Sequence, residues 1–593
     1  MMPAEPLQPL TRAQRNLVIA ATVVVAVTRC LALSRTLWDW DEALFSVAVR
    51  SYDVTQHHPH PPGFPLFILA AKAVHLFIRD EFRDVQAVTL LGAIGLFPAL
   101  FLLARELRFP FFVAVAGALM YAFLPPVWIF GGTAFSDIPS TTLVIAACTL
   151  LLRGARDRLA LIAGALLLGI SVGFRSQNLL IGCVPALYAT WSQIRARAWG
   201  TLVAAMSLGA AVVAASYIGA AYASADPPHG YLESVANLRA YVHNVDSFLN
   251  PGRTPLRALL FDYFVHPMRS GRFVDYIIDA LAALGLVVTF RRFGTVMALA
   301  MFLPFQLFAW LMLDPFSISR YGTAYLPLYA LLAAAGAYAV AFYSAHIVIV
   351  AVILTRLIVW TAPAVRTVRS SESPPAAAMN EIVRSHSPQS VFVHRSMSPF
   401  ADYYLASIPT TDVVDERTLP LDPRLASALY VCEAVKPEGK VYQRPHDALW
   451  NIVRQRYFEV TLTTLGRLWR FADGWHDQEG EATNVYRWMK GRSVTYLPVV
   501  GTRGRLALQF GIPAPLVHAA PTLTVVLNGR VIDRVRCTTA EMARTWDVAA
   551  SPDRANELVL SIDRVVNPLR DHLGSDARDL GVRIDRYDWT PVR

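Results

Sequence analysis

Long apolar runs separated by short polar loops occupy the first 365 residues of this 593-residue chain. A membrane-spanning helix needs about 20 predominantly apolar residues. We predict eleven spans, at approximately residues 16–34, 86–104, 110–130, 137–152, 159–174, 176–194, 198–223, 275–290, 293–313, 321–342 and 345–363. The first run could instead be a signal peptide, but it is long and no Ala-x-Ala-like cleavage site follows it.

The apolar segment Phe64–Phe77 is left out of this count because it is short and carries Lys72 and His75. We expect it to lie along the membrane interface. Without it, the loops on one side of the membrane hold clusters of arginine, namely Arg105, Arg108, Arg153, Arg156, Arg158, Arg195, Arg197, Arg291 and Arg292. Such loops face the cytoplasm. We therefore predict a multi-pass protein of the plasma (inner) membrane, with a cytoplasmic N-terminus and a periplasmic or extracellular C-terminal domain.

The chain turns polar from about residue 366, and its pattern changes to short strands and helices. Farther on, Leu506, Leu508 and Phe510 alternate with polar or small residues, and Asn528-Gly529 reads as a hairpin turn. The predicted fold class is a multi-spanning α-helical membrane protein of about eleven spans, followed by a soluble α/β segment and a β-sandwich (jelly-roll-like) domain. The predicted domains are residues 1–365, 366–480 and 481–593.

The composition agrees with this division. Hydrophobic residues make up 54% of the chain and charged residues 17%, against about 25% charged in a soluble domain. The formal charge of +10 follows from the loop arginines, so nucleic acid is not expected as a partner, whereas membrane lipids are. Five scattered cysteines show no metal-binding spacing and no disulfide framework, although Cys432 and Cys537 in the polar half could form a bridge.

The loop after the first span concentrates polar side chains. Asp39, Asp41 and Glu42 are followed closely by the histidine-rich segment His57–Gly63. Carboxylates at a membrane surface are functional candidates, and transfer of a sugar from a phosphate-linked donor needs a base to accept the proton of the acceptor hydroxyl. Asp41 and Glu42 are therefore candidate catalytic residues. The alternatives are solvated loop acids, or an N-cap for a helix beginning at Ala43.

Further candidates stand at the outer ends of predicted spans. Asp137 either caps a helix or joins the same site as Asp41. The histidines could bind a divalent metal, although their spacing matches no standard ligand set, and a hydrogen bond from His60 to substrate is preferred. The remaining candidates would hold a phosphate or, alternatively, anchor in lipid head groups: Arg175, Gln177, Arg320 and Tyr321.

Several of these motifs together resemble the GT-C superfamily of membrane glycosyltransferases, in particular protein O-mannosyltransferases and the lipid A aminoarabinose transferase with its bacterial relatives. They are Trp40-Asp41-Glu42, His60-Pro61-Pro62-Gly63, Ser136-Asp137-Ile138-Pro139 and Arg320-Tyr321. The resemblance covers roughly residues 14–365. It implies that Asp41 is the base, that Glu42 and Asp137 contact the acceptor or a metal, and that the donor is a polyprenyl-phosphate-linked sugar, transferred with inversion on the exoplasmic side.

The chain departs from the mannosyltransferase pattern in two respects. It has His-Pro-Pro-Gly-Phe-Pro where the family has His-Pro-Pro-Leu-Gly-Lys, and it has no MIR-type loop insertion. Both departures weigh against a protein acceptor. The C-terminal region resembles jelly-roll domains appended to bacterial glycosyltransferases, which says little about the substrate.

The leading expectation is an inverting glycosyltransferase that acts on a lipid, glycan or protein acceptor. One rival is a transporter or flippase for a lipid-linked sugar, which would need polar residues along the membrane midplane and repeated halves. Another is a non-catalytic membrane protein that displays the β-domain to bind glycans.

Overall fold

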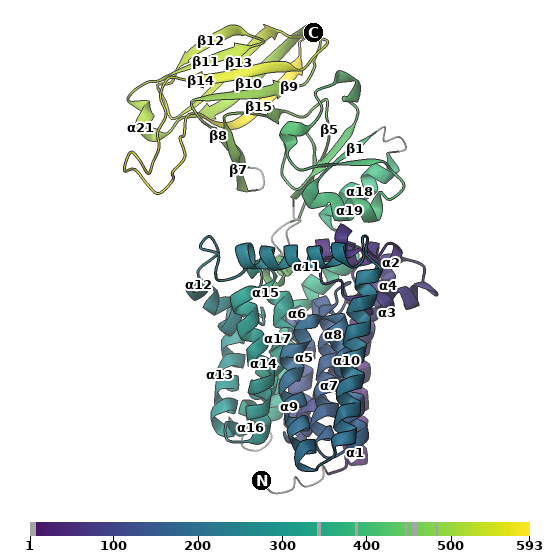
Figure 1. Cartoon of the computed structure of the whole chain (residues 1–593). Coiled ribbons are helices and arrows are strands. Elements are labelled where there is room, and N and C mark those ends of the chain that lie inside the picture. Colours follow the sequence, from purple (N-terminus) through teal and green to yellow (C-terminus); the bar gives the residue numbers. More distant parts are fainter. Residues whose placement is uncertain are drawn as a thin grey trace. The chain divides into compact units, whose positions relative to one another are not determined.

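The computed structural model describes residues 8–340, 345–385, 390–444, 447–453, 459–481 and 484–592. The chain forms two compact units (Figure 1). One comprises Met1–Ser373 with Pro445–Arg456, and the other Pro374–Arg444 with Tyr457–Arg593. Whether the three predicted domains fold separately stays a prediction, and residues 482–483 at their second boundary lie outside the described residues.

The first unit is helical. Its longer helices are α1 (Arg12–Cys30), α4 (Glu81–Glu106), α5 (Phe111–Phe123), α7 (Asp137–Gly154), α8 (Arg158–Phe174), α9 (Leu179–Arg195), α10 (Trp199–Tyr222), α11 (His229–Tyr241), α13 (Arg272–Thr289), α14 (Phe293–Met312), α16 (Leu326–Val340) and α17 (Ala345–Ser370). Its shorter helices are α2 (Trp40–Arg50), α3 (Pro65–His75), α6 (Pro125–Phe130), α12 (Leu256–Leu260), α15 (Ile318–Gly322) and α20 (Ala448–Ile452).

A helix of this unit falls within each predicted span, but the count of eleven is not confirmed. By length and composition, six of the described helices could cross a membrane, or seven if the bent pair Pro315–Gly322 and Leu326–Val340 forms one span. Helices such as α5 are too short to pass, and residues 341–342 of the tenth predicted span lie outside the described residues. The interfacial placement of α3 stays a prediction.

Three of the arginine-rich loops meet at one end of the helical unit. The buried Glu106 carboxylate at the end of α4 pairs with Arg153 at 3.0 Å and with Arg156 at 2.5 Å. In the same region Gln193 of α9 donates to the Gly154 carbonyl at 2.7 Å. Helices α2, α3 and α11 lie together at the opposite end (Figure 1). The alternation of loops that was predicted from the arginines is therefore present in the fold.

A proline pair divides the predicted span at 110–130 into α5 and α6. Because Pro126 has no N–H, the Ala122 carbonyl four residues earlier loses its helical partner. The fully buried Arg29 of α1 donates to this carbonyl, and its guanidinium lies 5.8 Å from the ring centres of both Phe123 and Trp128. This hydrogen bond joins α1 to the end of α5, just before the break between α5 and α6.

The second unit begins with a small α/β region. Strands β1 (Val391–His394), β2 (Thr410–Val413), β3 (Leu429–Cys432), β4 (Lys440–Gln443) and β5 (Glu459–Thr464) form one sheet in the order β2-β1-β3-β5-β4. Strands β2 and β3 pair with β1 in parallel, whereas β5 pairs antiparallel with β3 and β4. Helices α18 (Pro374–Arg384) and α19 (Ser398–Tyr404) complete the predicted α/β segment.

Two further five-stranded sheets enclose one apolar core. The first has the order β13-β10-β15-β8-β7 and the second β12-β11-β14-β9-β6. Their strands are β6 (Arg470–Phe471), β7 (Trp475–Glu481), β8 (Asn484–Met489), β9 (Arg492–Leu497), β10 (Arg503–Gly511), β11 (Thr522–Leu527), β12 (Arg530–Arg536), β13 (Glu541–Ala549), β14 (Asn556–Ile562) and β15 (Arg583–Pro591). The short helix α21 (Ala514–Val517) follows β10.

The side chains of this sandwich follow the predicted alternation. Leu506, Leu508 and Phe510 are buried in the shared core. Asn528 and Gly529 both have positive φ, as the tight turn between β11 and β12 requires. The structure therefore confirms the predicted fold class of a helical part followed by α/β and β-sandwich parts. Cys432 and Cys537 are free, so they form no bridge.

Candidate active site

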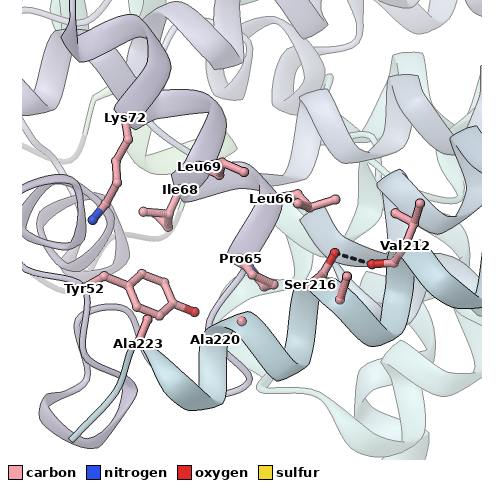
Figure 2. A pocket seen from close by; sticks show the side chains of 12 residues that line it. Tyr52, Pro65, Leu66, Ile68, Leu69, Lys72, Val212, Ser216, Ala220 and Ala223 are labelled. Atoms are coloured by element: carbon pink, nitrogen blue, oxygen red, sulfur yellow. Dashed lines mark hydrogen bonds between the residues drawn. The ribbon is translucent and has the colours of Figure 1, made fainter.

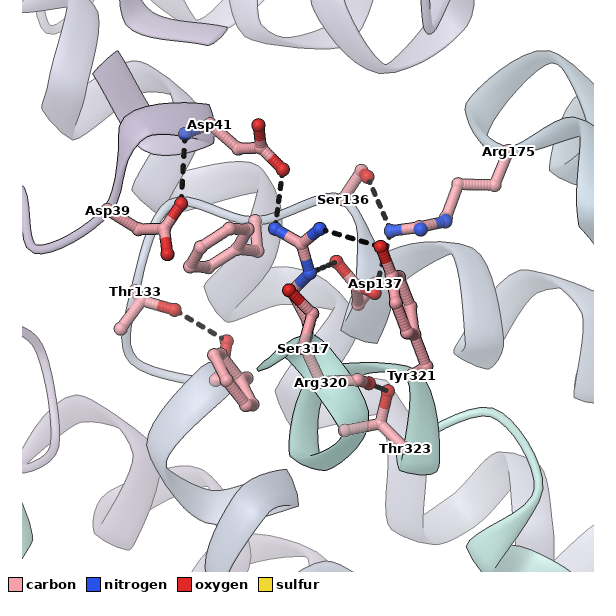
Figure 3. Close-up of polar contacts among 12 residues, drawn as sticks. Asp39, Asp41, Thr133, Ser136, Asp137, Arg175, Ser317, Arg320, Tyr321 and Thr323 are labelled. Carbon is pink, nitrogen blue, oxygen red and sulfur yellow. Dashed lines mark hydrogen bonds and ion pairs between the residues drawn. The ribbon is translucent and has the colours of Figure 1, made fainter. Parts of the chain in front are cut away.

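Asp41 lies in the first turn of α2 and pairs with an arginine from the far end of the helical unit's sequence. The Asp39 side chain caps α2 and accepts a hydrogen bond from the Asp41 amide at 3.0 Å. Arg320 of α15 then donates from Nη1 to Oδ2 of Asp41 at 2.5 Å (Figure 3). The N-cap is thus Asp39, and the Asp41 carboxylate remains available for contacts outside its own helix.

Asp137 and Arg175 form the second ion pair of the site. Asp137 opens α7, and Arg175 directly follows α8, where the backbone becomes extended. Arg175 Nη1 lies 2.6 Å from Asp137 Oδ1, and Arg320 Nε lies 4.0 Å from Asp137 Oδ2. Arg320 therefore contacts both carboxylates (Figure 3). Asp137 pairs across helices instead of capping α7.

Aromatic rings and a histidine surround these charges. The Arg320 guanidinium lies 4.9 Å from the Phe135 ring centre, and that of Arg175 lies 5.8 Å from the Phe64 ring centre. His60 packs against Phe64, with its Nδ1 3.6 Å from Asp41 Oδ1. Phe135 and Phe64 were not predicted, because apolar residues next to polar motifs give no distinct signal in the sequence.

Burial and pairing set the charge states of the site. Burial alone would favour the neutral form of Asp41, but the adjoining Arg320 guanidinium and His60 outweigh it and lower the pKa of Asp41 to about 2. Burial lowers the pKa of His60 below its usual range. At neutral pH the site therefore holds an ionised Asp41 beside a neutral imidazole.

Glu42 has a different environment from its neighbour Asp41. Its fully buried carboxylate accepts backbone hydrogen bonds from Trp38 at 2.6 Å and Asp39 at 3.0 Å through Oε2, and from Ala134 at 2.8 Å through Oε1. Together with the Asp39 side chain it forms a capping box. Glu42 thus links the start of α2 to the loop that precedes Asp137. Its carboxylate contacts backbone amides and not the charged side chains of the cluster.

Of the two remaining predicted residues, one contacts the charged cluster and the other does not. Tyr321 lies with the cluster, its hydroxyl 3.4 Å from Arg320 Nη2. Gln177 lies on the helical turn Ser176–Asn178, and no hydrogen bond joins its side chain to the cluster in the described structure. The buried Asn178 was not predicted; it donates to the carbonyls of Ser140 and Ser171 at 3.1 and 3.0 Å, which holds the turn after Arg175 in place.

The metal hypothesis finds no ligand set in this region. Within the described ranges, no group of three His, Cys, Asp or Glu side chains is arranged to hold a metal ion. Asp41 and Asp137 each already pair with a guanidinium. These cations occupy the position that a divalent ion would need beside the carboxylates, so the residues present do not fit one.

An apolar cavity of about 460 Å³ lies between α3 and α10, next to this cluster. Leu66, Ile68 and Leu69 face Ala220 and other small residues of α10 across it (Figure 2). Among the described residues that line it, Lys72 alone is charged, with Nζ 5.8 Å from the Tyr52 ring centre. On the α3 side, the first residue of the lining is Pro65. The residue before it, Phe64, has its ring next to the Arg175 guanidinium.

The chain matches no protein-family model and no curated protein at a significant level. Among solved structures it is similar to ArnT from Cupriavidus metallidurans bound to undecaprenyl phosphate, at 13% identity over 77% of this chain and 99% of that chain, with a TM-score of 0.46. It is also similar to the S. cerevisiae protein O-mannosyltransferase Pmt1-Pmt2 complex bound to the sugar donor, at 18% identity over 38% of this chain and 35% of that chain, with a TM-score of 0.30.

A third similar structure is the arabinosyltransferase EmbB from Mycobacterium smegmatis, at 12% identity over 100% of this chain and 66% of that chain, with a TM-score of 0.37. The O-mannosyltransferases are one of the groups that the sequence resembles. With TM-scores below 0.5, these likenesses do not assign the chain to a family.

Proposed function

We propose that the chain is an inverting GT-C-type glycosyltransferase that moves a sugar from a polyprenyl-phosphate donor to a lipid, glycan or protein acceptor. The observation that carries this proposal is the position of Arg320, which touches both Asp41 and Asp137 beside an apolar cavity. A carboxylate base, guanidinium groups for a phosphate, and an apolar surface for a lipid are the parts that such a transfer needs.

The proposed reaction is a single displacement at the sugar. The acceptor hydroxyl oxygen forms a bond to the anomeric carbon while the bond from that carbon to the phosphate oxygen breaks. The hydroxyl proton passes to Asp41, and the electron pair of the broken bond leaves with the phosphate. Arg320 and Arg175 stabilise the negative charge that develops on the phosphate, as guanidinium forks do for phosphate oxygens.

The Asp41–Arg320 pair also explains how the base becomes active. While it is paired, Asp41 has a pKa of about 2 and is a weak base, since an effective base has a pKa near the working pH. A donor phosphate that draws Arg320 away removes the cation that lowers this pKa. In the donor complex the effect of burial is then less opposed, so the pKa of Asp41 rises and the carboxylate becomes a stronger base.

The cavity between α3 and α10 is the proposed place of the donor's isoprenoid chain. Its lining is almost entirely apolar, and its wall begins at Pro65, next to the ring of Phe64 near Arg175. A lipid chain in this cavity would leave its phosphate close to the arginines. Lys72 adds a positive charge along the same path.

The proposed orientation follows from the two ends of the helical unit. The arginine-rich loops meet at one end, and positively charged loops face the cytoplasm. The cluster of Asp41 and Arg320 then faces the exoplasmic side of the plasma membrane. A cytoplasmic N-terminus and a periplasmic or extracellular C-terminal unit complete this arrangement.

The direct test is Asp41→Asn in the full chain. Membranes that contain this variant are supplied with labelled polyprenyl-phosphate hexoses and pentoses, and transfer of label is compared with the wild-type chain. We expect loss of transfer by at least about 100-fold, since a general base contributes roughly 10²–10⁴ in rate. Wild-type transfer by Asp41→Asn would remove Asp41 from the proposed mechanism.

Asp226→Asn is the matched control for this substitution. Asp226 is an exposed acid whose side chain pairs with His229 at 3.4 Å. We expect this variant to transfer label at the wild-type rate. Mass spectrometry of lipid that copurifies with the full chain provides a readout of donor binding that does not depend on turnover.

A further inference from the structure

A second cavity of about 460 Å³ lies in the helical unit, away from the α3–α10 cavity. Its walls come from the π-helical turn Phe261–Val265 and the residues after it, from α17, and from α20. Helix α20 belongs to the segment that returns to this unit from the C-terminal half of the sequence. The volume falls in the range of small-molecule sites, roughly 300–1,000 Å³.

Aromatic side chains supply flat apolar surface to this cavity. Phe261, Trp360 and Trp450 all contribute to its lining. The Trp360 indole Nε1–H donates to the Arg269 carbonyl at 2.9 Å, which holds the ring in one orientation. Rigid aromatic faces combined with a few oriented polar groups are typical of sites for rings that have one apolar face and polar edges, such as sugars.

The charged groups of the cavity leave an excess of positive charge. Arg269 is almost fully buried and pairs with Asp262 at 3.1 Å, and His266 pairs with Asp275 of α13. Arg272 forms no ion pair with any residue that the structure describes, and its guanidinium lies 5.8 Å from the Phe261 ring centre. An exposed arginine beside an aromatic ring suits a phosphate or a carboxylate.

The segment that forms this cavity packs against the helix that carries Arg320. A Cβ atom added to Gly322 would lie 3.6 Å from the Pro267 carbonyl oxygen. The Tyr325 hydroxyl donates to the Tyr263 carbonyl at 3.4 Å. The segment that contributes Phe261–Arg272 to the cavity is thus connected to α15 through Tyr263 and Pro267, although no residue of α15 lines the cavity.

We infer that this cavity binds a sugar unit that carries a negative charge, either a phosphate or a carboxylate. In the proposed transfer reaction this unit belongs to the acceptor, and that assignment rests on the proposed function. The binding itself does not, because the cavity, its tryptophans and Arg272 are separate from Asp41 and its partners.

The test is a binding titration, measured by isothermal calorimetry, with the full chain in phosphatidylcholine nanodiscs. The probes are a hexose phosphate, a hexuronate, the neutral hexose and inorganic phosphate. We expect one or both charged sugars to bind at least about tenfold more tightly than the neutral hexose and inorganic phosphate, which corresponds to one charge-assisted hydrogen bond. The two charged sugars distinguish a phosphate from a carboxylate.

Arg272→Ala should weaken binding of the charged sugar by about tenfold or more. Arg257→Ala, an exposed arginine of the same segment outside this cavity, should leave it unchanged. Equal binding of all four probes, no binding of either charged sugar, or the same affinity in Arg272→Ala would each overturn the inference. Because no step requires transfer, a failure here is distinguishable from a failure of the Asp41→Asn test.

Discussion

Asp41 and Arg320 are separated by 279 positions in the chain, yet Oδ2 of the first lies 2.5 Å from Nη1 of the second. The pair joins the first turn of α2 to the short helix before α16. It makes the protonation state of the carboxylate depend on what else the arginine binds.

Arg320→Gln should change the pH dependence of transfer. Asp41 must be ionised to accept a proton, and Arg320 helps to lower its pKa to about 2. Without the guanidinium, burial raises that pKa, so activity should be lost at a higher pH as the solution is acidified. The measurement is kcat/KM against pH, each variant scaled to its own maximum. Arg320→Lys keeps the charge and should keep the acid limb near that of the wild-type chain; identical profiles for Gln and Lys variants would contradict the coupling.

Glu42→Gln should destabilise the helical unit and slow transfer. The carboxylate accepts three backbone hydrogen bonds, and an amide nitrogen in place of one oxygen would face N–H donors. We expect a cost of about 2 kcal/mol, read as a lower midpoint of thermal unfolding in detergent. Glu233→Gln, on the exposed surface of α11, is the control and should not change the midpoint. A stable Glu42→Gln variant without activity would instead indicate a direct role in the reaction.

Gly219→Leu should weaken binding of a long-chain donor. Gly219 lines the α3–α10 cavity, and an added Cβ there meets no atom within 4 Å. The larger side chain therefore fills the cavity without disturbing the helices. We expect KM for the lipid donor to rise by about tenfold or more while kcat changes little. Gly200→Leu lies on the same helix, has equally open surroundings and is outside the cavity; an equal effect there would argue against this place for the lipid.

Gly285→Ala should be among the most damaging single-carbon changes in the helical unit. Helices α13 and α16 approach so closely that a Cβ on Gly285 would lie 1.9 Å from the Leu332 carbonyl oxygen. Alanine forces the helices apart, at a cost of about 1–3 kcal/mol or more. Thermal unfolding in detergent measures the loss. Gly200→Ala has open space around it and should be neutral or slightly stabilising.

The convergence of the charged residues was partly accessible from the sequence. Alternating arginine-rich loops placed Asp41, Asp137, Arg175 and Arg320 on one side of the bundle, and all four meet there. The pairing itself was not predictable, because hydropathy assigns a side of the membrane but not a neighbour across it. Asp41 and Glu42 are adjacent and were both predicted to be catalytic, but the spacing of Asp39 and Glu42 is that of a capping box.

Other features left weaker signals in the sequence. The predicted spans agree with helices, but α5 contains only 13 residues because Pro125 and Pro126 end the regular helix early. The tryptophan-lined cavity was not foreseen, since one of its walls comes from residues 450–451, in an aromatic and basic stretch without clear periodicity. Contacts between distant segments depend on packing in three dimensions, which the hydrophobic pattern of one segment does not predict.

The return of α20 to the helical unit bears on how this protein is made. Its contacts with α17 include the Thr367 hydroxyl, 3.4 Å from Asp447 Oδ2, and Trp450 and Asn451 close the cavity beside Trp360. The last spanning helix leaves the ribosome well before these residues are synthesised. The helical unit therefore reaches its final form only after translation has passed through most of the α/β sheet, and a chain truncated after residue 373 would contain every predicted span but lack one wall of the cavity beside Trp360.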